Sequence, residues 1–233
     1  IRVDVIPSHY LSRNSSYPAL AGANVNGARD QLVWPARVNP GINRGYRPEM
    51  LRNGRLKEFT AAGGQWIYEG DLMPDLTGDY FIPEPAANFV RRSKLNFAEG
   101  TVLSVNAHED DEFLTSSDER FRPVNVTTGP DGALYIVDFH RGVIQHRVSL
   151  TSYLRSQILD RGLDKHLHRG RIYRIVPENH LSSGFKVATK PDHEEWLKRL
   201  SHPNHWWRGQ AQRELILQGD PAIIPTLRQL AMK

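Results

Sequence analysis

Short segments that alternate apolar and polar residues recur between residues 55 and 177, each separated from the next by a turn containing Gly or Asp. This period of two predicts strands that bury one face. Short strands at such spacing are typical of a β-sandwich or a β-propeller. The predicted strands are Leu56–Thr60, Gln65–Glu69, Asp79–Pro83, Asn88–Leu95, Thr101–Ala107, Arg122–Thr127, Ala133–Asp138 and Gly170–Val176.

Two runs favour the propeller over the sandwich. GPDGALYIVD places a Pro-Asp-Gly turn between two predicted strands, and GRIYRIV adds a strand that closes the same unit. At roughly 40 to 45 residues per blade, residues 1–177 supply about three or four blades, and a closed ring has about four to eight. An open ring would expose a long strand edge. We therefore expect a partial propeller, with the missing blades supplied by the same protein or by another chain.

A helical insertion is predicted inside the last blade, at about residues 148–162. Thr151 or Ser152 is placed to cap a helix that ends near Leu159, with Leu154 and Ile158 on one face. Gly162 follows where a helix is expected to stop.

Beyond Pro177 the pattern changes from strands to helices. Residues 178–191 are predicted to be a linker, and residues 192–233 to begin a HEAT-like helical repeat. Asp220-Pro221 has the form of a helix cap followed by proline at the first helical position. The expected helices are His193–Leu200, His205–Leu217 and Ala222–Met232. One such repeat cannot bury its own apolar face, so more of the array is expected beyond this sequence.

Composition excludes several classes of site. The net charge of +4 is spread along the chain without a basic run, which disfavours a nucleic-acid arm. No apolar stretch approaches the length of a membrane span. The sequence has no cysteine, which excludes disulfides, zinc–thiolate sites and covalently attached c-type haem in these residues.

Four runs of the sequence together resemble one protein family: EPAANFVRR, FLTSSDERFRPVNVTTGPDGALYIVDFHRGVIQH, YLRSQILDRGLDK and GRIYRIVP. They are similar to the membrane-bound dehydrogenases of planctomycetes and verrucomicrobia, which are relatives of the soluble quinoprotein glucose and sorbosone dehydrogenases. The resemblance covers roughly residues 1–177.

The resemblance implies a six-bladed propeller followed by HEAT-like repeats, and here only its later blades. It also implies a dehydrogenase that oxidises a sugar or alcohol with pyrroloquinoline quinone (PQQ) and passes electrons to a c-type cytochrome. Calcium is a second cofactor of these relatives. Family habit further suggests export to the periplasm.

Four residues are candidates for binding the quinone. Arg120 and Arg122 stand two apart before a predicted strand, so their side chains are expected on one face. In the relatives, an Arg-x-Arg at the matching place holds the cofactor, whose carboxylates suit the planar guanidinium fork. Glu84 and Asn88 belong to EPAANFVRR, where the relatives carry a cofactor-binding lysine that this sequence lacks.

Other polar residues are weighed against structural roles. Asp138, His140 and Arg141 follow a predicted strand and are placed to line a channel mouth, although no general base is assigned. The acidic run HEDDE, residues 108–112, is placed to attract a metal, but its spacing fits no EF-hand and a solvated turn is preferred. The aromatic pair Trp206 and Trp207 is expected to pack against the linker rather than to bind sugar.

Two functions remain open. The first is the quinone-dependent dehydrogenase. The alternative is a non-catalytic propeller and helical-repeat module that binds a polysaccharide or a protein. A hydrolase or lactonase propeller would need Asn, Asp and Glu side chains converging on calcium, and the sequence does not show that set.

Overall fold

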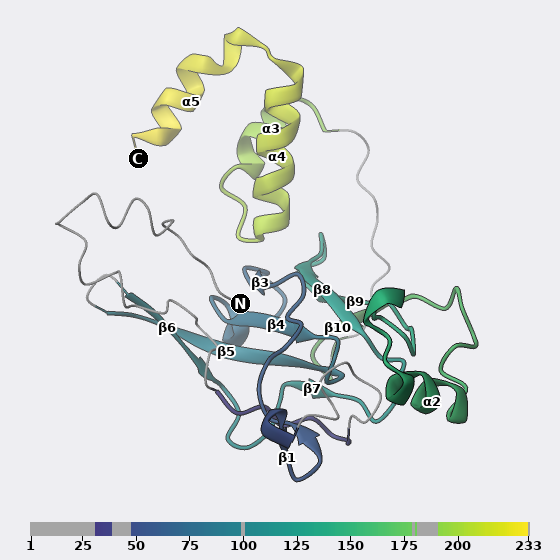
Figure 1. The fold of residues 1–233 in the computed structure, drawn as a ribbon. Coiled ribbons are helices and arrows are strands. Elements are labelled where there is room, and N and C mark those ends of the chain that lie inside the picture. Colours follow the sequence, from purple (N-terminus) through teal and green to yellow (C-terminus); the bar gives the residue numbers. More distant parts are fainter. Residues whose placement is uncertain (1–30, 39–47, 99–100, 179, 181–190, 233) are drawn as a thin grey trace, which may run out of the picture. The chain divides into compact units, whose positions relative to one another are not determined.

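The computed structural model of the protein describes residues 31–38, 48–98, 101–178, 180 and 191–232 (Figure 1). The chain divides into two compact units. The first contains residues 1–66, 79–126 and 137–172, and the second contains residues 67–78, 127–136 and 173–233. Most of the predicted linker lies outside the described residues.

The largest sheet has the strand order β3-β4-β5-β6, and β7 also pairs with β5. Strands β4 and β5 are antiparallel, with Glu84 opposite Phe89. The register of β5 with β6 pairs Ser93 with Asn106. The bounds are β3 (Trp66–Ile67), β4 (Tyr80–Glu84), β5 (Phe89–Ala98), β6 (Thr101–Asn106) and β7 (Leu114–Thr115).

Two further sheets complete the β structure. A hairpin joins β1 (Leu51–Arg52) to β2 (Arg55–Leu56) through Asn53 and Gly54. Both turn residues have positive φ, 51° and 74°, as a two-residue hairpin turn of the Asn-Gly type requires. The third sheet has the order β10-β9-β8, formed by β8 (Pro123–Thr128), β9 (Leu134–Asp138) and β10 (Arg171–Ile175).

The helices follow the capping signals of the sequence. In the first unit α2 (Ser152–Asp160) begins at Thr151, whose side chain accepts a hydrogen bond from the N–H of Leu154. In the second unit are α3 (His193–Arg199), α4 (His205–Gln218) and α5 (Ile224–Ala231). Short 3-10 turns are η1 (Pro48–Met50), η2 (Pro74–Leu76), η3 (Arg147–Ser149) and η4 (Pro221–Ile223). Asp220, expected to cap the last helix, caps η4, and α5 begins at Ile224.

Each unit has a small apolar core. In the first, Val33, Leu56 and Phe89 pack together with Ala86 and Ala87. In the second, α3 and α4 lie against each other (Figure 1) and bury Trp196, Ala211 and Leu215. No helix in the described part of the chain is long and apolar enough to cross a membrane.

The predicted class, mainly β with an α-helical C-terminus, is confirmed. The three sheets are antiparallel, and none of them closes on itself within the described ranges. The partial six-bladed propeller and the HEAT-like repeat stay predictions. One predicted strand, Leu56–Thr60, is wrong beyond its first residue, because the N–H groups of Thr60 and Ala61 donate to the Glu84 carboxylate instead of to a neighbouring strand.

Candidate functional site

Glu84, the last residue of β4, is fully buried and organises the main chain around it. Its Oε2 accepts the N–H groups of Thr60 and Ala61, each over 2.9 Å. Its Oε1 accepts the N–H of Ala86 over 3.0 Å. Burial raises the pKa of Glu84, although these backbone hydrogen bonds oppose the rise. The carboxylate therefore ties a loop to the β4–β5 turn.

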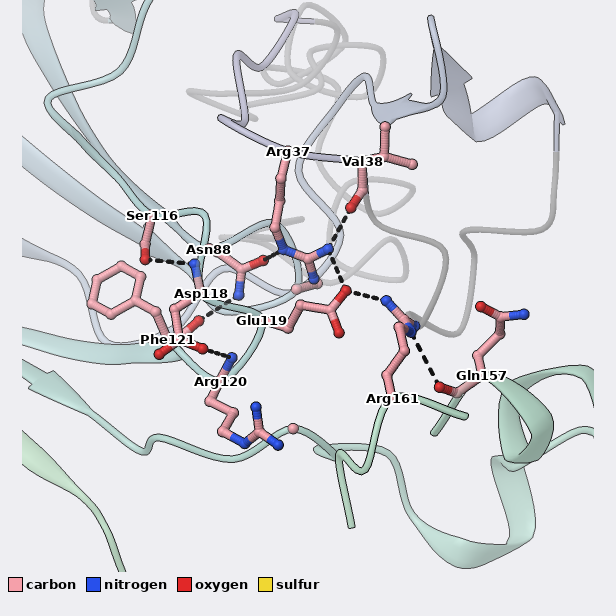
Figure 2. Close-up of polar contacts among 12 residues, drawn as sticks. Arg37, Val38, Asn88, Ser116, Asp118, Glu119, Arg120, Phe121, Gln157 and Arg161 are labelled. Atoms are coloured by element: carbon pink, nitrogen blue, oxygen red, sulfur yellow. Dashed lines mark hydrogen bonds and ion pairs between the residues drawn. The ribbon is translucent and has the colours of Figure 1, made fainter. Parts of the chain in front are cut away.

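Asn88 is the last residue of that turn and is also fully buried. Its φ of 62° lies in the left-handed region, which Asn tolerates better than most residues. Its Nδ2 donates to the carbonyl of Phe121, and its Oδ1 accepts from Nε of Arg37 over 3.1 Å (Figure 2). Both ends of the Asn88 amide are thus engaged.

Glu119 lies between two arginines in Figure 2. It accepts Nη1 of Arg37 over 2.8 Å and Nη1 of Arg161. Burial lowers the pKa of Arg37, and the neighbouring charge of Arg161 lowers it further against the effect of Glu119. Arg120 stands beside this group and donates from Nη2 to the carbonyl of Gly162 over 2.9 Å. The sequence did not single out Arg37 or Arg161.

Arg122 is 1% exposed, and its guanidinium donates only to main-chain carbonyls. Its Nε bonds the carbonyl of Arg141 over 2.9 Å, and its Nη2 bonds that of Gly142 over 3.1 Å. Its Nη1 bonds Pro85 over 2.7 Å and Ala86 over 3.4 Å. Burial lowers the pKa of Arg122 to about 10, with a further contribution from the charge of Arg37.

The four predicted residues do not fit the quinone as a group. A tricarboxylate needs guanidinium or amide donors that are still available, and every guanidinium nitrogen of Arg122 already has a carbonyl partner. Asn88 and Glu84 are likewise engaged. Of these four residues, only Arg120 keeps a buried donor, Nε, without a hydrogen-bond partner among the described residues.

Asp138, the last residue of β9, and His140 form a buried pair. Asp138 Oδ1 accepts the main-chain N–H of Arg122 over 2.7 Å and that of His140 over 2.8 Å. Nδ1 of His140 lies 3.1 Å from Asp138 Oδ2, and its Nε2 lies 3.2 Å from Nη2 of Arg171. Both ring nitrogens have a partner, as expected of a structural histidine.

The acidic run is divided between core and surface. Glu112 is buried and forms an ion pair with Arg91, which is also fully buried. Asp110 and Asp111 are exposed. In the described part of the chain, no three His, Asp or Glu side chains gather as a metal site would require.

The Trp206–Trp207 pair packs within the second unit. The rings meet edge to face at 4.7 Å, and Nε1 of Trp207 donates to the carbonyl of Pro130 over 2.9 Å. The guanidinium of Arg199 lies 4.0 Å from the Trp207 ring centre. The pair therefore packs against Pro130 and Arg199, and most of the linker predicted to cover it lies outside the described residues.

A pocket of about 450 Å³ opens in the first unit beside Trp34, and we call it the Trp34 pocket. Its volume lies in the usual range for ligand sites. Its lining residues are Trp34, Pro35, Ala36, Arg52, Asn53, Arg55, Asp110, Asp111 and Thr115. No sequence pattern predicted this pocket, because its lining residues come from three distant segments.

Trp34 is held firmly in this pocket. Its main-chain N–H donates to Oε1 of Glu112 over 3.0 Å. The guanidinium of Arg52 lies 3.9 Å from the Trp34 ring centre, a cation–π contact, and also donates to the carbonyl of Val33 over 2.8 Å. Because Glu112 is fixed by buried Arg91, the aromatic wall is set before any ligand arrives.

Comparison with known proteins identifies one family. The family described as a domain of unknown function, DUF7133, matches residues 2–179. No curated protein and no solved structure matches the chain.

Proposed function

The chain belongs to the DUF7133 family, and we propose that this member is a module that binds a neutral saccharide in the Trp34 pocket. In this proposal residues 1–177 form later blades of a six-bladed propeller, and residues 192–233 begin a HEAT-like repeat. The antiparallel sheets and the packed α3–α4 pair support such an architecture. Export to the periplasm belongs to the same proposal.

The balance of charge in the Trp34 pocket carries the proposal. Two arginines, Arg52 and Arg55, face two aspartates, Asp110 and Asp111, in one lining. A pocket without net charge favours a neutral polar ligand over a tricarboxylate such as PQQ. An indole wall suits the C–H face of a sugar ring, and carboxylate, amide and guanidinium groups suit its hydroxyls.

Two pocket residues keep side-chain groups available for a ligand. The side chains of Asn53 and Asp110 have no hydrogen-bond or ion-pair partner in the described ranges. Both residues have φ of 51°, in the left-handed region.

Calorimetric titration of the full chain with a panel of neutral oligosaccharides tests the proposal. We expect at least one to bind, and Asp110→Asn to weaken it about tenfold through loss of a charged acceptor. Asparagine tolerates the left-handed backbone, so the fold should be kept. Glu109→Gln, an exposed neighbour outside the pocket lining, is the matched control and should bind as the parent does.

Absence of binding by every neutral saccharide would overturn the proposal. Equal loss in Asp110→Asn and Glu109→Gln would also do so, because the effect would then come from surface charge rather than from the pocket.

A quinone-dependent sugar or alcohol dehydrogenase, with a c-type cytochrome as electron acceptor, is the second candidate. Besides the resemblance of the sequence, one observation favours it: Nε of Arg120 and Nη2 of Arg161 are buried without partners among the described residues. Dye reduction by the chain supplied with PQQ, calcium and a sugar tests it. Activity lost in Arg120→Gln and kept in Asp110→Asn would favour the cofactor reading over the saccharide module.

A further inference from the structure

A second pocket lies inside the insertion between β9 and β10, away from the residues of the Trp34 pocket. Its volume is about 520 Å³, within the range of small-molecule sites. Aliphatic side chains from α2 and its flanks line it, Ile158, Leu159 and Leu163 among them. We call it the insertion pocket. Its charged lining residues are Arg141, Arg147, Arg155 and Asp164.

The charge of the insertion pocket is unbalanced, with three arginines against one aspartate. The side chains of Arg147 and Arg155 are exposed and form no hydrogen bond or ion pair in the described part of the chain. Arg141 lies 5.5 Å from the ring centre of Phe139 and likewise has no acidic partner there. Guanidinium groups with free forks beside an apolar wall suit a carboxylate.

The pocket is held in shape by main-chain contacts. The N–H of Leu163 bonds the carbonyl of Ile158 over 2.9 Å. Gly142 packs so closely on Leu163 that an added Cβ would lie 2.4 Å from the Leu163 carbonyl oxygen. Arg120 holds Gly162, just after α2, and Arg122 holds Gly142, well before it. A preformed pocket loses less entropy when a ligand binds.

We propose that the insertion pocket binds a small aliphatic carboxylate, with its chain against the α2 wall and its carboxylate on the arginines. The lining contains no aromatic ring among the described residues, which disfavours a nucleobase or another stacked ring. Six of the ten lining side chains are aliphatic, so a fully polar anion would leave most of the surface unmatched.

Titration calorimetry with three probes that share an eight-carbon chain tests this site. Octanoate should bind the full chain, whereas octanol, which lacks the charge, should bind about tenfold more weakly or worse. Octyltrimethylammonium should not bind, because its charge is repelled. Equal affinity for octanoate and octanol would overturn the proposal, since apolar adsorption alone would then explain the signal. Failure of octanoate to bind would overturn it too.

Substitutions at Arg147 and Arg155 test whether octanoate binds in the insertion pocket. The double variant Arg147→Gln/Arg155→Gln should weaken octanoate about tenfold and leave thermal stability unchanged, because neither side chain has a partner to lose. Arg213→Gln, an exposed arginine on α4, is the matched control. Octanoate affinity equal in the double variant and the control would contradict the site.

Discussion

Nη2 of Arg122 donates to the carbonyl oxygen of Gly142 over 3.1 Å, at the beginning of the insertion that follows β9. Two residues earlier, Arg120 donates to the carbonyl of Gly162 over 2.9 Å, just beyond α2. The Arg-x-Arg pair thus holds the insertion at two points, one before α2 and one after it. The motif that resembles a cofactor clamp holds main-chain carbonyls of the chain itself.

Arg122→Lys should destabilise the fold by about 3 kcal/mol or more, because several buried carbonyls lose their donor at once. Arg120→Lys, which gives up a single carbonyl contact, should cost about 1 kcal/mol. Urea unfolding followed by tryptophan fluorescence measures both values. Similar losses in the two variants would contradict the special role of Arg122.

Glu84→Gln should destabilise the fold by about 1 to 3 kcal/mol. Both carboxylate oxygens accept main-chain N–H groups, and the amide would turn one acceptor into a donor that faces another donor. Glu58→Gln is the matched control, since Glu58 has no partner in the described part of the chain. The same unfolding measurement applies, and an unchanged midpoint for Glu84→Gln would refute the account.

The sequence predicted those parts of the fold that local chemistry determines. Alternation located the strands from β4 to β10 except β7, and Thr151 and Asp220 were correctly expected near helix starts. Alternation predicted a strand wrongly where a distant side chain binds the backbone, as the Glu84 carboxylate does at Thr60.

The candidate site was less predictable than the fold. An Arg-x-Arg spacing indicates a shared face, but the partners of Arg122 are carbonyls that every residue possesses, so they leave no pattern to find. The HEDDE run gave no hint that Glu112 pairs with buried Arg91 while Asp110 reaches a pocket. Only the folded chain brings such segments together.

Asp131, in the Gly-Pro-Asp-Gly turn, should make the free energy of unfolding depend on pH in the acidic range. Burial alone would raise its pKa, but hydrogen bonds from Arg174, Ala133 and Tyr135 outweigh burial and place the pKa below the ordinary value. The unfolded chain therefore binds the proton more readily below about pH 4. The stabilisation is present above that pH and is lost as the pH falls through the folded pKa.

The difference in unfolding free energy between the parent and Asp131→Asn should accordingly shrink as the pH is lowered below about 4. Urea titrations at neutral pH and in this acidic range measure it. A difference that is constant over the whole range would show that the Arg174–Asp131 contact has no net effect on proton binding.

Gly63→Ala should destabilise the fold by about 1 to 3 kcal/mol. An added Cβ would lie 2.5 Å from the carbonyl oxygen of Val124 in β8, and main-chain atoms cannot move aside cheaply. Gly209→Ala in α4 is the matched control, because nothing lies within 4 Å of its added Cβ. That control should stabilise the chain by about 0.5 to 1 kcal/mol. Thermal melts distinguish the lower melting temperature expected for Gly63→Ala from the higher one expected for Gly209→Ala.

Arg120 and Arg122 attach to the insertion through main-chain carbonyl oxygens of Gly162, Arg141 and Gly142, and Gly142 has no room for a Cβ. Exposed positions of α2, such as Arg155 and Leu159, take no part in these contacts. The side chains that line the insertion pocket are therefore separate from the main-chain oxygens that attach the insertion to the rest of the unit.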